Sequence, residues 1–75
     1  MPRATRFSRD SFGRAVRKER EKLGLSQEAF AEHADVHRTY ISSIELGKVS
    51  IGIEVANSIA AAFGMKLSEL VRRAE

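Results

Sequence analysis

Hydrogen-bonding side chains line one face of a short helical segment at residues 37–46, and their types suit the edges of nucleic-acid bases. Arg38 carries a planar guanidinium group that can bond bidentately to O6 and N7 of guanine. Thr39 offers a hydroxyl to a base edge and a methyl group to thymine, and Ser43 lies one helical turn further along. Ser42 and His37 stand at the edges of that face. We predict that these residues read bases, although the same side chains would also solvate an exposed helix.

Two short helices joined by a tight turn are needed to hold that face outward. The sequence predicts them at residues 26–34 and 37–46, with Asp35 and Val36 in the turn. Ala31 is small where the two helices touch most closely. The apolar residues between them are Phe30, Ala34, Val36, Ile41 and Ile44. A helix held in this way fits the major groove of DNA, which admits one α-helix.

Three further helices complete the expected fold. Ser8 or Asp10 caps a helix that runs to about residue 23, and two more are expected at 53–63 and 67–73. Residues 48–52 alternate like a strand, but the run is short and has no partner, so we expect an extended loop. The inward positions predicted for these helices are Phe12, Val16 and Leu23, then Val55, Ala56, Ile59, Ala60 and Phe63, then Leu67, Leu70 and Val71. The sequence therefore predicts an all-α, five-helix bundle at residues 9–75, preceded by a basic arm at residues 1–8.

Composition restricts the class of protein. Seventy-five residues allow one domain, and 31% charged residues with 43% hydrophobic residues fit a compact helical protein. There is no cysteine, and no apolar run is long enough to span a membrane or to form a signal peptide. A cytoplasmic protein without a membrane partner is expected.

Charge is distributed unevenly along the chain. Residues 1–22 hold eight Arg and Lys against three acids, a local charge of +5, which leaves −2 for the remainder. Such asymmetry indicates a polyanionic partner, although helical surfaces are often basic for solubility alone.

The segment 26–46 resembles the helix-turn-helix of the lambda-type repressor and Cro family. The matching positions are Gln27, Ala31, Val36, Ile41 and Ile44, flanked by Arg20 and by the runs LGLSQ at 23–27 and IELGK at 44–48. The similarity extends over residues 10–73 and implies a lambda repressor-like DNA-binding domain. The small size and the stretch HRTYISSIE at 37–45 particularly resemble the controller proteins of restriction–modification systems. Small prophage regulators and antitoxins are also similar.

The resemblance implies roles for four positions. Gln27 lies where the family clamps the DNA backbone, so it is a candidate phosphate ligand. Arg20 and Glu45 correspond to a partly buried, structural salt bridge between the first helix and the end of the third. The family usually has glycine where this chain has Asp35, so Asp35 is expected to adopt a positive φ.

Other cations and a tyrosine are candidates for phosphate binding. Lys48 follows the third helix, and Arg14 and Arg17 lie on the first. Tyr40 could bond phosphate through its hydroxyl, or its ring could simply pack. Arginines near the amino terminus form a candidate flexible arm, namely Arg3, Arg6 and Arg9.

One domain covers one half-site, so the resemblance implies a homodimer on a palindromic operator in double-stranded DNA. The candidate interface is the loop before the fourth helix, with Val49, Ile51 and Ile53, together with the last helix. Core packing of Ile51 is an equal alternative.

Other functions are less well supported by the residues. His33 and His37 are separated by a turn, and nothing completes a metal site, so we expect no metal, no cofactor and no enzyme activity. An antitoxin-like or other protein-interaction module, with a toxin or RNA polymerase as main partner, is the alternative from another class. A single-strand or RNA binder would need aromatic stacking platforms, whereas most of the five aromatic residues are needed for the core.

Overall fold

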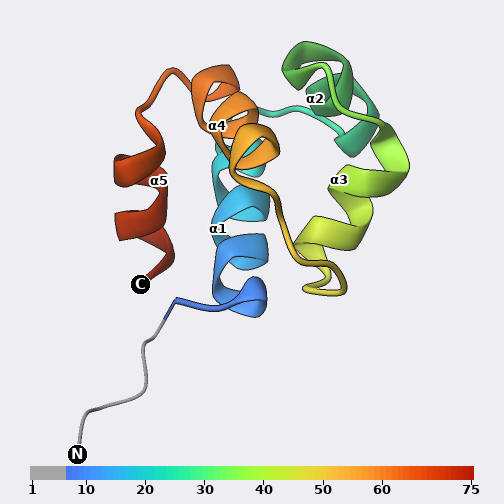
Figure 1. Cartoon of the computed structure of the whole chain (residues 1–75). Coiled ribbons are helices and arrows are strands. Elements are labelled where there is room, and N and C mark those ends of the chain that lie inside the picture. Colours follow the sequence, from blue (N-terminus) through green and yellow to red (C-terminus); the bar gives the residue numbers. More distant parts are fainter. Residues whose placement is uncertain (1–6) are drawn as a thin grey trace, which may run out of the picture.

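The computed structural model describes residues 7–75, which form five α-helices with short connections (Figure 1). The helices are α1 (Arg9–Lys22), α2 (Gln27–Ala34), α3 (Arg38–Glu45), α4 (Ile53–Ala62) and α5 (Leu67–Ala74). Every helix begins and ends within one residue of its predicted bounds, so the all-α, five-helix prediction is confirmed. Residues 48–52 form a loop without a strand, also as predicted. Within the described part of the chain, no helix has the length and apolar character needed to cross a membrane.

Serine side chains fix the starts of the first two helices. Ser8 accepts a hydrogen bond from the Ser11 amide at 3.1 Å, while the Ser11 hydroxyl accepts one from the Ser8 amide at 2.8 Å. This reciprocal capping box satisfies two amides that have no partner within the helix. Ser26 caps α2 in the simpler way, with its hydroxyl accepting from the Ala29 amide at 3.0 Å.

The predicted arm lies largely outside the described residues, which begin at Phe7, so Arg3 and Arg6 are not placed. Phe7 itself contacts α1, because its ring meets Phe12 edge to face with centroids 5.9 Å apart. Arg9 was wrongly predicted to belong to the arm, because the Ser8 cap starts the helix there and Arg9 is the first residue of α1.

The helices pack around α1 and α4. Helix α1 contacts α3 on one side and α5 on the other, α2 contacts α3 and α4, and α4 contacts α5. Figure 1 accordingly shows α5 at one side of the molecule and the α2–α3 pair at the other. The two helices of the predicted helix–turn–helix, α2 and α3, therefore pack against α4 and α1 respectively.

The core is drawn from all five helices. Its largest fully buried side chains are Phe12, Val16, Phe30, Ile41, Ile44, Ile59 and Leu70. Phe63 is only partly buried, but its ring stacks on Phe30 with centroids 4.5 Å apart and an interplanar angle of 14°. Val36 and Leu67 also pack against this core at its margin. Most of the side chains predicted to face inward therefore lie in the core or pack against it.

Leu23 is the inward position that was predicted wrongly, because its side chain is 53% exposed. Helix α1 ends at Lys22, and Gly24 then turns the chain with a φ of 72°. Leu25 packs against the core instead. The prediction extended the apolar face of α1 to Leu23 by helical periodicity, but at that point the helix no longer packs against another helix.

Candidate nucleic-acid interface

A tight turn sets the angle between α2 and α3. Asp35 adopts φ 59° and ψ 45°, the left-handed region, which confirms the positive φ predicted there. The Val36 amide then donates a hydrogen bond to the Ala31 carbonyl oxygen at 2.9 Å, which ends α2. An Asp in this conformation is tolerated better than most side chains. The turn therefore brings α3 across α2 without glycine.

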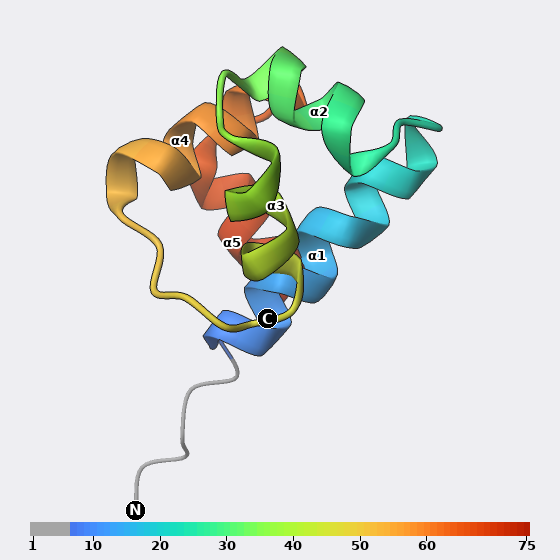
Figure 2. The ribbon, with the colours of Figure 1, turned by 90° about the vertical axis from the view of Figure 1, so that its right-hand side faces the viewer.

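Burial of one side of α3 leaves the opposite side outward. Ile41 and Ile44 have no exposed surface. Arg38 and Thr39 are exposed, while Ser42 and Ser43 are partly covered. Figure 2 shows α3 in front of α1 and α5, with nothing between it and the viewer. The structure thus brings the predicted base-reading residues to the free side of one helix.

Chemically, this surface of α3 presents one cation and three hydroxyls. No acid within residues 7–75 forms an ion pair with Arg38. Its guanidinium group is therefore available for an acceptor pair such as O6 and N7 of guanine. The hydroxyls can donate or accept, and the methyl group of Thr39 can meet thymine. Such a surface matches the mixed pattern of a major-groove edge.

Tyr40 lies beside this surface, with its ring packed against the core. Its hydroxyl donates to the carbonyl oxygen of Ser50 at 3.5 Å, a long hydrogen bond to the loop between α3 and α4. The packing alternative therefore describes Tyr40 in this structure. A phosphate contact would replace the bond to Ser50.

A buried carboxylate ties α1, α2 and α3 together. Glu45, whose side chain is 3% exposed, accepts from Arg20 Nε at 2.7 Å and from Arg20 Nη2 at 3.0 Å. This is the ion pair that the resemblance implied. Arg20 Nη1 also donates to the Leu25 carbonyl oxygen at 2.8 Å. The hydrogen bonds that Arg20 donates to Glu45, together with the charge of that carboxylate, raise the pKa of Arg20 above its ordinary value, although burial acts against this.

Gln27 belongs to the same network, which the sequence did not reveal. Its Nε2 donates to Glu45 Oε1 at 3.0 Å. This bond uses one N–H of the amide and leaves the second N–H for another acceptor. Gln27 is the first residue of α2, so the remaining donor lies beside helix amides that also favour an anion.

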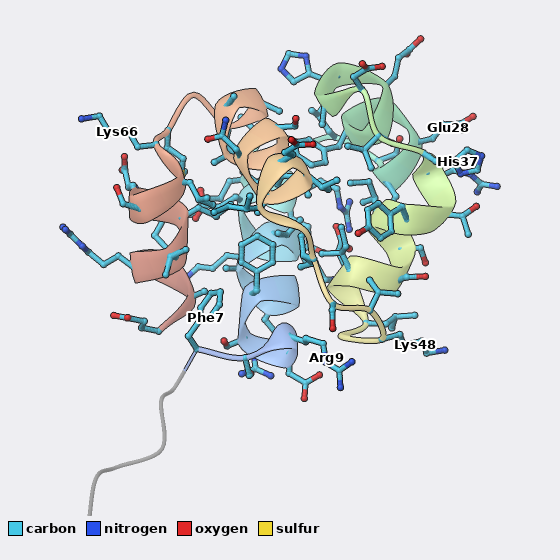
Figure 3. All side chains as sticks on the ribbon, viewed as in Figure 1. Phe7, Arg9, Glu28, His37, Lys48 and Lys66 are labelled. Carbon is cyan, nitrogen blue, oxygen red and sulfur yellow. The ribbon has the colours of Figure 1, made fainter. Side chains whose placement is uncertain are left out.

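The other cations named from the sequence differ in availability. Arg17 Nε donates to Glu21 Oε2 at 3.0 Å, so Arg17 is engaged on the surface of α1. Arg14 and Lys48 are exposed, and neither forms an ion pair in the described residues. Lys48 projects from the lower edge of the molecule in Figure 3, beyond the end of α3. Arg14 and Lys48 are therefore the freer pair.

Gly13 has a role that the sequence analysis missed. A Cβ atom there would collide with the carbonyl oxygen of Ile44 and would lie 2.9 Å from that of Glu45. The backbones of α1 and α3 therefore touch at this point. An isolated glycine within a helical pattern was the available signal, because it usually has a packing reason.

An apolar hollow lies between the start of α1, the start of α4 and helix α5. Its volume is about 390 Å³, and its lining is Phe7, Ser8, Arg9, Phe12, Ile51, Ile53, Ala56, Leu67 and Val71. Ile53 is 75% exposed, whereas Ile51 and Val49 are partly buried against the core. Of the three interface residues predicted, only Ile53 is largely exposed.

The two histidines have separate surroundings. His33 lies in the last turn of α2, whereas His37 caps α3. Within residues 7–75, no group of three or more His, Cys, Asp or Glu side chains comes together as metal ligands would.

Comparison with known proteins agrees with this geometry. The chain belongs to the helix-turn-helix family, whose model matches residues 16–70. It is a DNA-binding transcriptional regulator, as the α3 surface indicates and as its relatives support. The match to this family confirms the resemblance seen in the residues.

The relatives narrow the class to controller-type regulators. The chain is 48% identical over 60 residues to control protein C.MunI from Mycoplasma sp, covering 79% of this chain and 81% of that protein. It is 39% identical over 61 residues to control protein C.BamHI from Bacillus amyloliquefaciens, covering 80% and 75%. The crystal structure of the restriction-modification controller protein C.AhdI from Aeromonas hydrophila superposes with a TM-score of 0.79 at 29% identity, over 83% of this chain and 94% of that one.

Proposed function

We propose that this protein is a restriction–modification controller that binds a palindromic operator as a homodimer, with α3 of each copy in a major groove. The observation that carries the proposal is the free side of α3, where exposed Arg38 and Thr39 stand opposite the buried Ile41 and Ile44. The similarity to C.MunI, C.BamHI and C.AhdI supports the controller role.

Base reading rests on the first turns of α3. Arg38 bonds to guanine bidentately, a contact worth about 1–3 kcal/mol of discrimination. Thr39 and Ser43 contact neighbouring base pairs, and Ser42 lies at the margin. The partial burial of the two serines limits them to close contacts.

Contacts with the phosphates of the DNA backbone fix the position of α3 along the groove. Gln27 donates its second amide N–H to a phosphate, and Lys48 and Arg14 supply charge on the flank. Arg17 adds less, because Glu21 already neutralises it. Tyr40 contributes if its hydroxyl leaves Ser50 for a phosphate oxygen.

Dimerisation places two copies of α3 on successive turns of one DNA face, about 34 Å apart. Ile53 and the hollow beside it form the apolar surface that a second copy covers. The protein acts in the cytoplasm, where it meets the DNA and RNA polymerase.

The test is selection and sequencing of bound duplexes from a random double-stranded library at near-physiological salt. An enriched inverted repeat is expected. Arg38→Ala should relax the preference at one base pair per half-site by about tenfold or more. Lys66→Ala is the matched control, since Lys66 is an exposed cation on the side of the molecule away from α3 (Figure 3) and should leave every preference intact.

Three results would count against the proposal. A folded protein that enriches no sequence would favour the protein-interaction alternative, with a toxin or RNA polymerase as partner. Enrichment of a single half-site without its repeat would argue against the dimer. A weak dependence of affinity on salt would likewise indicate few phosphate contacts.

A further inference from the structure

His37 begins α3 and caps it with its own ring. The residue is extended, with φ −62° and ψ 140°, and its Nδ1 accepts a hydrogen bond from the Thr39 amide at 3.1 Å. That amide is one of those at a helix start that have no partner within the helix. The usual residues at this position are Ser, Thr, Asp and Asn, so an imidazole is an unusual choice.

The cap determines which ring nitrogen carries the proton. A nitrogen that accepts a hydrogen bond carries no proton, so the neutral ring must have its proton on Nε2. Nε2 is then a hydrogen-bond donor only. No residue in the described part of the chain bonds to Nε2, and the side chain is exposed at the outer edge of α3 in Figure 3.

This donor is also held in place. The bond to Thr39 restrains the ring, so little rotamer freedom is lost when Nε2–H meets an acceptor. The ring precedes Arg38 and Thr39 directly, at the end of α3 that leads into the groove. With α3 in the major groove as proposed, a fixed donor at this place would face the edge of a base pair.

We infer that His37 is a specificity-determining residue that donates its Nε2–H to a base acceptor next to the base pair read by Arg38. In the major groove, guanine presents O6 and N7, adenine presents N7 and thymine presents O4, whereas cytosine presents a donor. His37 therefore selects against cytosine at its position, because cytosine offers no acceptor there. This inference rests on the proposed function, because it requires α3 in the major groove.

A purely structural His37 would cap α3 and do nothing more. His37→Ser separates the two roles, because serine is a good cap and lacks the outward Nε2–H. The variant should keep the melting temperature of the wild-type protein or slightly exceed it. His37→Ala, which removes cap and donor together, should melt earlier than His37→Ser.

The decisive measurement is the base preference of wild type and His37→Ser in the same duplex selection. We expect the variant to accept cytosine at one position of each half-site, with discrimination there falling about 2- to 10-fold, the range for one neutral hydrogen bond. Anisotropy titrations of the selected duplex and of its cytosine-substituted version check the same ratio.

Each other outcome overturns the inference in a recognisable way. Unchanged preferences in His37→Ser would show a cap and nothing else. An equal loss of affinity for all duplexes would show a phosphate contact. A wild-type protein that enriches no sequence would refute the proposed function itself, and the inference with it.

The free protein offers a test that needs no DNA. A long-range proton–nitrogen NMR spectrum at about pH 8 should show the His37 proton on Nε2 and a bare Nδ1. His33, an exposed histidine in the last turn of α2, provides the internal comparison. A proton on Nδ1 of His37 would overturn the inference.

Discussion

The two sides of α1 are built by different means. Against α3, the contact consists of touching backbones at Gly13 and of a closed polar network centred on Glu45. On the opposite side, the start of α1 borders an apolar hollow beside the exposed Ile53. No buried side-chain nitrogen or oxygen among the described residues lacks a hydrogen-bond partner.

This difference separates what one chain completes alone from the apolar surface that we propose a second copy covers. The network fixes α3 and Gln27 within the monomer, so the DNA-facing geometry exists before any partner arrives. The hollow is apolar and open, and burial of apolar surface is what commonly drives association. Mutations on the two sides should therefore affect different measurements.

The largest effect is expected from Glu45→Ala. It leaves the Arg20 guanidinium without its carboxylate and removes the partner of Gln27. The free energy of unfolding should fall by about 3 kcal/mol, the lower end for breaking a buried pair, because Arg20 keeps its bond to Leu25. Urea unfolding of the variant measures this loss.

Glu45→Gln is the control for that prediction. A glutamine keeps the shape and an acceptor for Arg20 but loses the charge, so its loss should be clearly smaller. If both variants were as stable as the wild-type protein, the network would not be what holds α1 to α3.

Gly13→Ala should produce the next largest loss. The added methyl group meets the Ile44 carbonyl oxygen, so α1 and α3 must separate. Overpacking outweighs the better helix propensity of alanine, and we expect a net loss of about 2 kcal/mol in thermal or urea unfolding. Gly52→Ala is the matched control, because its Cβ meets nothing within 4 Å. Its cost as a less suitable cap should stay below about 1 kcal/mol.

Ile53→Ser tests the other side of α1. Because Ile53 is 75% exposed, its replacement should hardly change the unfolding of the monomer. It should weaken self-association by about tenfold or more, as expected for an apolar residue central to an interface. Sedimentation equilibrium measures this directly. Leu23→Ser removes an apolar side chain that is also more than half exposed but lies outside the hollow, and should leave association unchanged.

The smallest predicted effect is a gain of stability. Asp35→Gly places a residue without Cβ at φ 59° and should raise the free energy of unfolding by about 0.5–1 kcal/mol. Asp35→Ala, by contrast, should lower it, because alanine tolerates the left-handed region less well than Asp. A lower melting temperature for Asp35→Gly would contradict the expected relief of strain.

Features that depend on residues close together in the sequence could be predicted from it. The helix bounds follow from serine caps, glycine stops and apolar spacing, and each of these acts over a few residues. The outward position of Arg38 follows from the inward positions of Ile41 and Ile44. The positive φ of Asp35 was inferred from the turn that the family pattern requires.

Features that depend on how segments distant in the sequence pack together could not be predicted from the sequence. The close approach at Gly13 depends on how α1 and α3 cross, and the bond from Gln27 to Glu45 joins residues 18 positions apart. Leu23 was misplaced because periodicity cannot show where a packed face ends. The His37 cap was missed because imidazole is rarely the capping group.

The backbone contact at Gly13 also has a mechanical consequence. No side chain lies between α1 and the end of α3 at that point to deform under load, and close-packed interiors are stiff. We therefore expect the monomer to present α3 at a fixed angle, which limits how far the helix can tilt within a groove. Adjustment of fit falls to the duplex, so base steps that bend easily should favour binding even where no side chain touches them.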